Sequence, residues 1–284
     1  MSPDAIALRP GCATERLSTR FGPVPLWNGA AGRERPALLL LHGAACGAWL
    51  WAEGFAAALA ARGLRVAAPD LPNGPGATLA DRLAVARAVM AALGGPVVLV
   101  GHSLGALLAQ RLADSPQAVG QVLLAPVPPE GLLPTQLRLW AADPRLWAEV
   151  ARMDAAPGSA PEDLIGGLFG PRMPPAAARR ILARLGGESR AALIEAQAPQ
   201  PVPPGWAVGC PALVLAGAAD RLIPPDAVWR CAAWHGTWPE FLPEAGHLLI
   251  LEPGWPAIVA RILQEIGRRF PAAEDPAWRS TSPK

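Results

Sequence analysis

Short runs of consecutive hydrophobic residues alternate with longer stretches of helical composition along the first half of the chain. The hydrophobic runs are bounded by turn-forming residues and predict strands buried on both faces, at residues 36–41, 64–70, 96–100 and 121–126. Helices are predicted between and after them, at residues 50–62, 78–93 and 104–113. Strands and helices that alternate through short links are typical of a parallel sheet with helices on both faces. The sequence therefore predicts an α/β fold.

The alternation stops near Pro126 and resumes about 80 residues later. Residues 130–205 are rich in alanine and proline, contain helical stretches and show no convincing strand. The second α/β portion comprises a strand at 211–217, a helix at 226–233, a short strand near Glu240 and a closing helix at 255–270.

This pattern predicts one α/β core with a helical insertion. We expect residues 13–129 and 206–270 to form the core, residues 130–205 to form a helical cap, and residues 1–12 and 271–284 to be flexible tails. The cap is expected over the edge of the sheet where the parallel strands end. In this architecture ligands bind in the crevice at that edge.

Composition narrows the class of protein. The chain of 284 residues is 51% hydrophobic and 17% charged, which excludes disorder for most of it. The net charge of +2 comes from scattered residues, so no nucleic-acid partner is expected. Residues 88–110 carry no charge, yet their glycines and Pro96 favour a strand, a turn and a helix over a membrane span.

The cysteines and the start of the chain predict a location. Four cysteines, at spacings that fit neither a metal site nor a disulfide framework, are expected to be thiols in a reducing compartment. The first twelve residues contain Asp4 and no apolar run of signal-peptide length. We therefore expect a cytoplasmic protein.

A nucleophilic serine is predicted in the segment Gly101-His102-Ser103-Leu104-Gly105. The segment directly follows a buried strand and precedes a helix, which is the context of a nucleophile elbow. At such a turn the serine has a strained backbone, and the flanking glycines leave room for neighbouring chain. Ser103 is therefore the candidate nucleophile.

A serine hydroxyl needs a base, and four histidines could supply it: His42, His102, His235 and His247. His102 adjoins the serine and should point away from it, while His235 has the setting of a surface residue. His247 lies in a loop after the last strand and before the final helix, from which a side chain can lean over the elbow. We therefore predict His247 as the base.

The base in turn needs a carboxylate that fixes its tautomer and stabilises its positive charge. Asp220 comes just after the strand at 211–217 and gives the chain order Ser, Asp, His. Asp226 opens the next helix and is expected to be its N-cap. Glu130, after the preceding strand, is the alternative acid.

Acyl transfer also needs donors for the oxyanion that develops on the carbonyl oxygen. The backbone N–H of Leu104, at a helix N-terminus, is one candidate. The N–H of Ala44, in the loop after the strand at 36–41, is the other, and Gly43 would allow a close approach there.

Several segments, in this order, resemble the α/β-hydrolase superfamily: LLHGAACGAWLW, APDLP, GHSLGALLAQRLA, LLAPVPP, LAGAADRLIPP and EAGHLLILEPGW. The first is also similar to plant methylesterases and hydroxynitrile lyases. The resemblance spans residues 36–270 and implies a serine hydrolase with Ser103, Asp220 and His247 as triad and a helical cap over the pocket. Two departures are the loop at 71–76, which lacks the usual Arg-Gly-His-Gly-type turn, and an oxyanion loop without the third glycine of lipases.

The cap is expected to supply a small apolar acyl pocket. Trp140 and Trp147 are seven residues apart on helical patterns, which suits the inner stripe of a cap, and Phe169 is the third candidate. Other apolar residues nearby are Leu132, Leu133, Leu168 and Met173.

The sequence thus predicts a serine hydrolase that cleaves a small apolar carboxylic ester through an acyl-enzyme intermediate. A thioesterase, a carbon–carbon bond hydrolase, an acyltransferase or a non-catalytic ligand receptor on this fold are the alternatives. No metal or organic cofactor is implied, and the expected partner is a small ester. Pairing of two copies through the cap is left open.

Overall fold

The computed structural model describes residues 14–29, 35–152 and 162–271. The segments expected to form flexible tails lie outside these ranges, except for Pro271.

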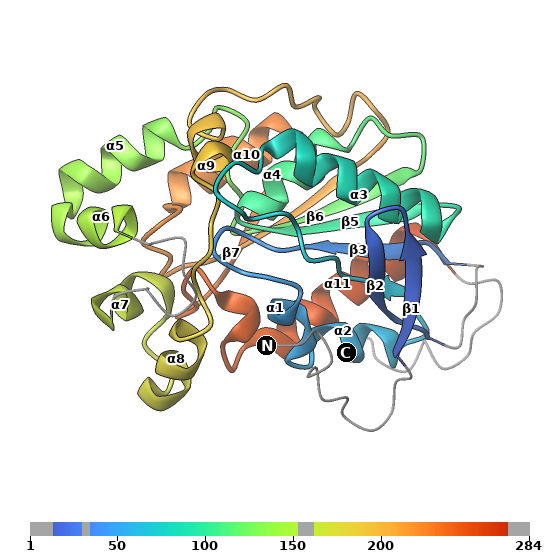
Figure 1. Ribbon diagram of the computed structural model, residues 1–284, viewed down its shortest axis with the longest axis horizontal. Helices are drawn as coiled ribbons and strands as arrows, with labels where there is room; N and C mark the ends of the chain where they lie inside the picture. Colours follow the sequence, from blue (N-terminus) through green and yellow to red (C-terminus); the bar gives the residue numbers. More distant parts are fainter. Residues whose placement is uncertain (1–13, 30–34, 153–161, 272–284) are drawn as a thin grey trace.

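An eight-stranded sheet forms the centre of the molecule, in the order β1-β2-β4-β3-β5-β6-β7-β8 (Figure 1). Its strands are β1 (Thr14–Thr19), β2 (Gly22–Trp27), β3 (Ala37–Leu41), β4 (Val66–Ala67), β5 (Val97–His102), β6 (Ala118–Leu124), β7 (Ala212–Gly217) and β8 (Pro239–Leu242). Pairing is parallel from β4 to β8 and antiparallel among β1, β2 and β4. The predicted α/β fold with a mostly parallel sheet is confirmed.

The antiparallel hairpin of β1 and β2 was not predicted from the sequence. Pro23 and Pro25 lie within β2, and proline argues against a strand because it cannot donate to the ladder. The Pro25 carbonyl accepts from Ala68 N–H, so the residue faces β4, which pairs with only Leu26 and Trp27. The missing N–H of Pro25 is tolerated because the side of β2 that faces β4 forms few backbone hydrogen bonds.

Helices cover both faces of the sheet and the end of it. They are α1 (Trp49–Ala52), α2 (Phe55–Ala60), α3 (Leu79–Leu93), α4 (Leu104–Arg111), α5 (Leu133–Ala142), α6 (Pro144–Ala151), α7 (Ile165–Leu168), α8 (Pro175–Leu182), α9 (Arg190–Glu195), α10 (Pro225–Trp234) and α11 (Trp255–Arg269). Alternate residues of the central strands pack into two separate cores. One core includes residues of α1, α2 and α11, and the other includes residues of α3, α4 and α10.

Of the helices expected at 50–62 and 78–93, the first is interrupted and the second forms as predicted. The helix expected at 50–62 is broken into α1 and α2 by Gly54, whose φ of 119° no side-chain-bearing residue adopts easily. The helix expected at 78–93 begins as its sequence indicates, because Thr78 and Asp81 form a reciprocal capping box.

Helices α5 to α9 lie in the chain between β6 and β7, where the described residues form no strand. In Figure 1 helices α5 to α8 gather at one end of the sheet, away from the β1–β2 hairpin. The uncharged segment 88–110 forms the end of α3, strand β5, a turn and the start of α4. None of the helices in the described ranges is long and apolar enough to cross a bilayer.

Candidate active site

Ser103 stands at a sharp turn between β5 and α4. Its φ of 54° and ψ of −118° lie in a region that non-glycine residues rarely adopt. A Cβ at Gly101 would collide with the backbone of Gly105 and Ala106, and a Cβ at Gly105 would collide with the Leu41 carbonyl oxygen. Both glycines are therefore required for the turn, as the predicted elbow demands.

His247 reaches the serine from the loop between β8 and α11. Its Nε2 lies 3.0 Å from Ser103 Oγ, a hydrogen-bond distance. The loop is held from two directions, because Gly246 N–H donates to Glu252 Oε1 at 2.8 Å and His102 Nε2 lies 2.9 Å from the His247 carbonyl oxygen. The structure thus brings together two residues that are 144 positions apart in the sequence.

Asp220 lies on the far side of the imidazole, in the turn after β7. Its Oδ2 is 2.8 Å from His247 Nδ1, and its Oδ1 accepts from the backbone N–H groups of Leu222 and Ile223 at 2.8 and 2.9 Å. These bonds fix the carboxylate, which in turn fixes Nδ1 as the protonated nitrogen and leaves Nε2 free to accept from the serine.

The alternative acids lie elsewhere. Glu130 Oε1 accepts from Arg230 Nε at 2.5 Å, and Asp226 pairs with Arg138 and Arg230. The expectation that Asp226 is the N-cap of its helix is wrong, because α10 begins at Pro225 and its N-cap is Pro224. Asp226 instead lies in the first turn, where a negative charge is favourable.

The other three histidines are buried and are held neutral. Burial lowers the pKa of His42 to about 4, that of His102 to about 3 and that of His235 to about 4. His235 was expected at the surface but is only 2% exposed: Gly205 N–H donates to its Nδ1 at 3.0 Å, and its Nε2 lies 3.1 Å from Gln110 Oε1. The run CAAWHGTW gives no sign of this burial, because the partners come from other segments.

The loop at 71–76, which departs from the usual family pattern, is hydrogen-bonded to His42 through its first residue. Leu71 N–H donates to His42 Nε2 at 2.9 Å, so Nδ1 carries the proton and donates to the Gly43 carbonyl at 2.9 Å. Leu71 is itself buried. The first residue of this loop therefore stabilises the turn that follows β3 by its hydrogen bond to His42.

Two backbone N–H groups near Ser103 are available to a ligand. A Cβ at Gly43 would lie 2.9 Å from Ser103 Cβ, so the turn after β3 passes directly against the serine. Within the described part of the chain, the N–H groups of Ala44 and Leu104 make no hydrogen bond. The next N–H along, that of Ala45, is already donated to Glu188 Oε2 at 2.8 Å.

A cavity of about 120 Å³ opens beside Ser103 and His247. Its walls are mainly aliphatic, with Leu132, Leu168, Leu185, Leu193, Leu222, Ile223 and Leu248 among the lining residues. Gln136 and Glu188 add polar groups from the segment between β6 and β7. Burial, with the nearby charge of Glu188, raises the pKa of the lining Cys46 thiol to about 12, so this sulfur is no second nucleophile at neutral pH.

The expected pocket residues Trp140, Trp147 and Phe169 do not line this cavity. Trp140 is 57% exposed on α5, Trp147 packs at the edge of the core, and Phe169 is buried in that core. A spacing of seven places two residues on one helix face, but it does not say which face turns inward. Leu132 and Leu168, from the same expected group, do line the cavity.

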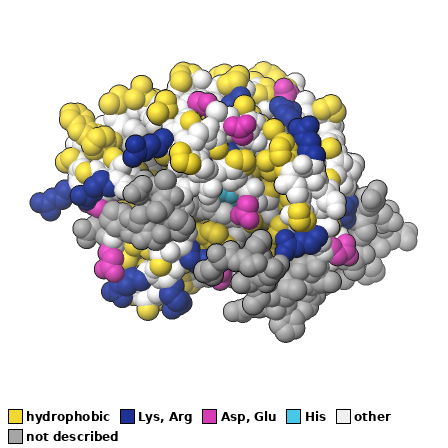
Figure 2. All heavy atoms as spheres, in the orientation of Figure 1, with side chains coloured by type: hydrophobic (Ala, Val, Ile, Leu, Met, Phe, Trp, Pro, Cys, Tyr) yellow, Lys and Arg dark blue, Asp and Glu magenta, His cyan; other side chains and the backbone are white. Residues whose placement is uncertain are grey.

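The outward face of α5 carries Leu133, Leu137 and Trp140, each more than half exposed. Figure 2 shows hydrophobic side chains gathered over this part of the surface. Within the described ranges no group of three or more His, Cys, Asp or Glu side chains could hold a metal ion.

Comparisons with known proteins agree with the fold. The sequence matches the model of the alpha/beta hydrolase family over residues 38–279. Similar solved structures include an esterase from Thermogutta terrifontis, at 23% identity over 92% of this chain and 100% of the other, with a TM-score of 0.62. A search of curated proteins finds no match.

Two further structures share the fold. Carboxylesterase CesB from Bacillus subtilis is 20% identical, with 89% of this chain and 91% of the other covered and a TM-score of 0.62. Esterase RhEst1 from a Rhodococcus species is 22% identical, with 89% and 98% covered and a TM-score of 0.64. At these identities the likeness establishes the fold.

Proposed function

The chain belongs to the alpha/beta hydrolase family, and on that basis we propose that it is a serine hydrolase that cleaves small, apolar carboxylic esters. The observation that carries the proposal is the continuous hydrogen-bonded series Ser103 Oγ, His247 and Asp220 at the wall of an aliphatic cavity. A nucleophile, a base and a group that orients the base are what acyl transfer to a serine requires.

In the first half of the reaction Ser103 Oγ attacks the ester carbonyl carbon while His247 Nε2 takes the hydroxyl proton. The carbonyl oxygen becomes an oxyanion, which the free N–H groups of Ala44 and Leu104 stabilise. Collapse of this intermediate breaks the ester C–O bond, and His247 passes its proton to the departing alcohol. An acyl group is left on Ser103.

Water completes the cycle. His247 Nε2 takes a proton from a water molecule, whose oxygen attacks the acyl carbon, and the same two N–H groups hold the second oxyanion. The acid then leaves and Ser103 regains its proton from His247. Asp220 stays ionised throughout and stabilises the imidazolium each time it forms.

The cavity sets the kind of acyl group. A volume of about 120 Å³ with aliphatic walls suits a short hydrocarbon chain. Thioesters, or carbon–carbon bonds next to a carbonyl, would meet the same nucleophile, so a substrate panel that compares them with esters determines the bond class.

Replacement of Ser103 tests the proposal. Ser103→Ala is expected to lower the turnover of p-nitrophenyl butyrate by more than about 10³-fold while the circular dichroism spectrum and the melting temperature stay close to those of the wild type. A fluorophosphonate probe should label the wild-type protein at Ser103 and leave the variant unlabelled.

A folded variant that keeps its activity would refute the serine mechanism. A folded wild type that hydrolyses no ester and takes no label would instead favour a ligand receptor on this fold.

A further inference from the structure

We propose that Glu188 is a positioning residue for the oxyanion site, and that the buried Arg82 holds its carboxylate and balances its charge. This inference rests on the function proposed above. It concerns two residues that no motif singled out, one in the segment between α8 and α9 and the other in α3.

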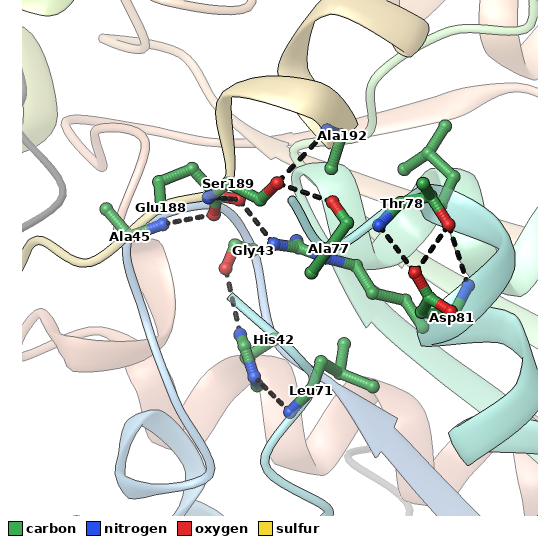
Figure 3. Close-up of polar contacts among 12 residues, drawn as sticks. His42, Gly43, Ala45, Leu71, Ala77, Thr78, Asp81, Glu188, Ser189 and Ala192 are labelled. Atoms are coloured by element: carbon green, nitrogen blue, oxygen red, sulfur yellow. Dashed lines mark hydrogen bonds and ion pairs between the residues drawn. The ribbon is translucent and has the colours of Figure 1, made fainter. Parts of the chain in front are cut away.

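The segment that contains Glu188 is hydrogen-bonded to the oxyanion loop, the turn after β3 that contains Ala44 and Ala45, at a single residue. Ala45 N–H donates to Glu188 Oε2 at 2.8 Å (Figure 3), and the Ala45 carbonyl accepts from Gly186 N–H at 3.1 Å. Both polar groups of the Ala45 backbone are thus bound by residues 186–188. Ala45 is the direct neighbour of Ala44, which lines the cavity together with Ser103 and whose N–H makes no hydrogen bond within the described part of the chain.

These two hydrogen bonds matter because the backbone of the loop adopts an unfavourable conformation at Ala45. Ala45 has a φ of 57°, in the left-handed region that costs free energy for a residue with a Cβ. Such a conformation persists only when its surroundings hold it, and the two hydrogen bonds from residues 186–188 do so. Gly186 and Gly187, with φ of 123° and 76°, let the gripping segment turn back onto the loop.

The carboxylate is itself fixed by further donors. Glu188 Oε1 accepts from Ser189 N–H at 2.6 Å and from Arg82 Nη2. Ser189 Oγ donates to the Ala77 carbonyl, just before α3, so with the Gly186 bond the segment is attached to the core on both sides of Glu188. Glu188 is 5% exposed and Arg82 is wholly buried. The two side chains therefore form a fixed pair rather than a mobile surface ion pair.

Two consequences for catalysis follow from this arrangement. Because Glu188 occupies the Ala45 N–H, the neighbouring Ala44 N–H is the one left for the oxyanion, in a fixed orientation. Because Glu188 lines the cavity, its charge would oppose a developing oxyanion, and the Arg82 guanidinium offsets that charge. Both effects act on the transition state more than on the bound ester.

A second glutamate provides a matched control. Glu195 Oε2 accepts from Leu79 N–H at 2.8 Å, which ties the same part of the chain to the core. This bond lies at the start of α3 and not at the oxyanion loop. Loss of Glu195 therefore removes a similar structural contact without touching Ala45.

The experiment compares Glu188→Ala, Glu188→Gln and Glu195→Ala in the full-length protein. Measured quantities are kcat and KM for p-nitrophenyl butyrate, the second-order rate of labelling by a fluorophosphonate, and the melting temperature. For Glu188→Ala we expect kcat and the labelling rate to fall about 10- to 100-fold with KM changed less than about threefold. Glu195→Ala should lower the melting temperature and leave both rates within about twofold of the wild type.

Glu188→Gln keeps the test decisive if the alanine variant fails to fold. Glutamine has one carbonyl oxygen, so it cannot accept from Ala45 N–H and from Arg82 and Ser189 together. We expect it to lower kcat and the labelling rate about tenfold at a nearly unchanged KM.

The proposal is overturned if a folded Glu188 variant keeps wild-type rates, or if it raises KM with kcat unchanged. It is also overturned if Glu188 and Glu195 variants lose activity in equal proportion to their loss of stability. A wild type that takes no label would contradict the serine mechanism itself, so the two failures are distinct.

Discussion

The two sides of the cavity are built in different ways. On one side, Ser103, Asp220 and His247 each follow a strand of the same sheet, and each is oriented by backbone hydrogen bonds or by steric limits within a few residues. On the other side, residues between β6 and β7 form an aliphatic wall that is joined to the core by contacts between residues far apart in the sequence, among them those of Glu188 and Glu195. The sheet side fixes the reacting atoms, whereas the helical side fixes the shape around them.

The contrast predicts that changes on the sheet side act on chemistry first. Asp220→Asn is expected to lower kcat by about 10³- to 10⁴-fold, because an amide facing Nδ1 favours the wrong imidazole tautomer and leaves the imidazolium without its countercharge. KM should change little. Steady-state kinetics with p-nitrophenyl butyrate, beside a melting curve, checks this.

If Asp220→Asn kept near-wild-type turnover, the acid would have to come from elsewhere in the chain. Glu130→Gln is the matched control, since Glu130 contacts Arg230 at 2.5 Å and should be dispensable for turnover.

Glu252 joins the two sides, and its loss should have an intermediate effect. Its Oε1 accepts from Gly246 N–H at 2.8 Å, beside His247, and from Gly170 N–H at 3.1 Å, in the segment between α7 and α8. Glu252→Ala leaves both buried donors unpaired, which is expected to cost about 2–4 kcal/mol of unfolding free energy and about tenfold in kcat. Urea unfolding and kinetics measure the two effects separately.

A loss of stability without any loss of kcat would show that the His247 loop needs no support from Glu252. Burial raises the pKa of Glu252, so this support involves a carboxyl that is harder to ionise than usual.

Buried histidines should make the protein acid-labile. The pKa of His235 is lowered from 6.5 to about 4 by burial, so between these values the unfolded chain binds more protons than the folded one. The contribution of the neutral, buried His235 to the unfolding free energy is therefore fully present above pH 6.5. It is lost as the pH falls toward 4, and the loss amounts to up to about 3 kcal/mol. His235→Gln should flatten the dependence of unfolding free energy on pH over this window and leave kcat at pH 8 nearly unchanged.

An equally steep pH dependence in His235→Gln would assign the acid lability to the other buried histidines, His42 and His102. Denaturant unfolding at a series of pH values, with the unfolding free energy compared at each, gives the measurement.

The smallest effect is expected at the outward face of α5. Trp140 is 57% exposed and makes no part of the cavity wall, so Trp140→Ser should change kcat less than twofold and stability by less than about 0.5 kcal/mol. A large loss of activity would mean that this face turns toward the substrate after all. A change in the elution volume on size-exclusion chromatography would show that two copies pair through it.

Prediction from the sequence succeeded where a short segment carries its own structural reason. Strands β3, β5, β6 and β7 are hydrophobic on both faces and were recognised, whereas β2 was missed because Pro23 and Pro25 disguise it. The tight turn at Ser103 was predicted from Gly101 and Gly105, and the structure leaves no room for a Cβ at either position. The predicted acid and base, Asp220 and His247, also lie at hydrogen-bond distances from their partners.

Prediction from the sequence is wrong for the three aromatic residues of the expected pocket. Trp140, Trp147 and Phe169 do not line the cavity, whereas Leu132 and Leu168 from the same expected group do, together with other aliphatic residues and Glu188. A periodic pattern states that a helix has an apolar face, and the face that turns inward depends on what the helix packs against.

The sequence by itself determined the fold class and the candidate nucleophile, base and acid, because strand, turn and helix signals act over a few neighbouring residues. Only the tertiary structure decided the shape of the cavity, the burial of His235 and the hydrogen bond between Glu188 and the oxyanion loop. Ala45 and Glu188 are 143 positions apart, and Arg82 and Glu188 are 106 apart. Contacts over such separations leave no local pattern, since they depend on how whole layers of the molecule pack against one another.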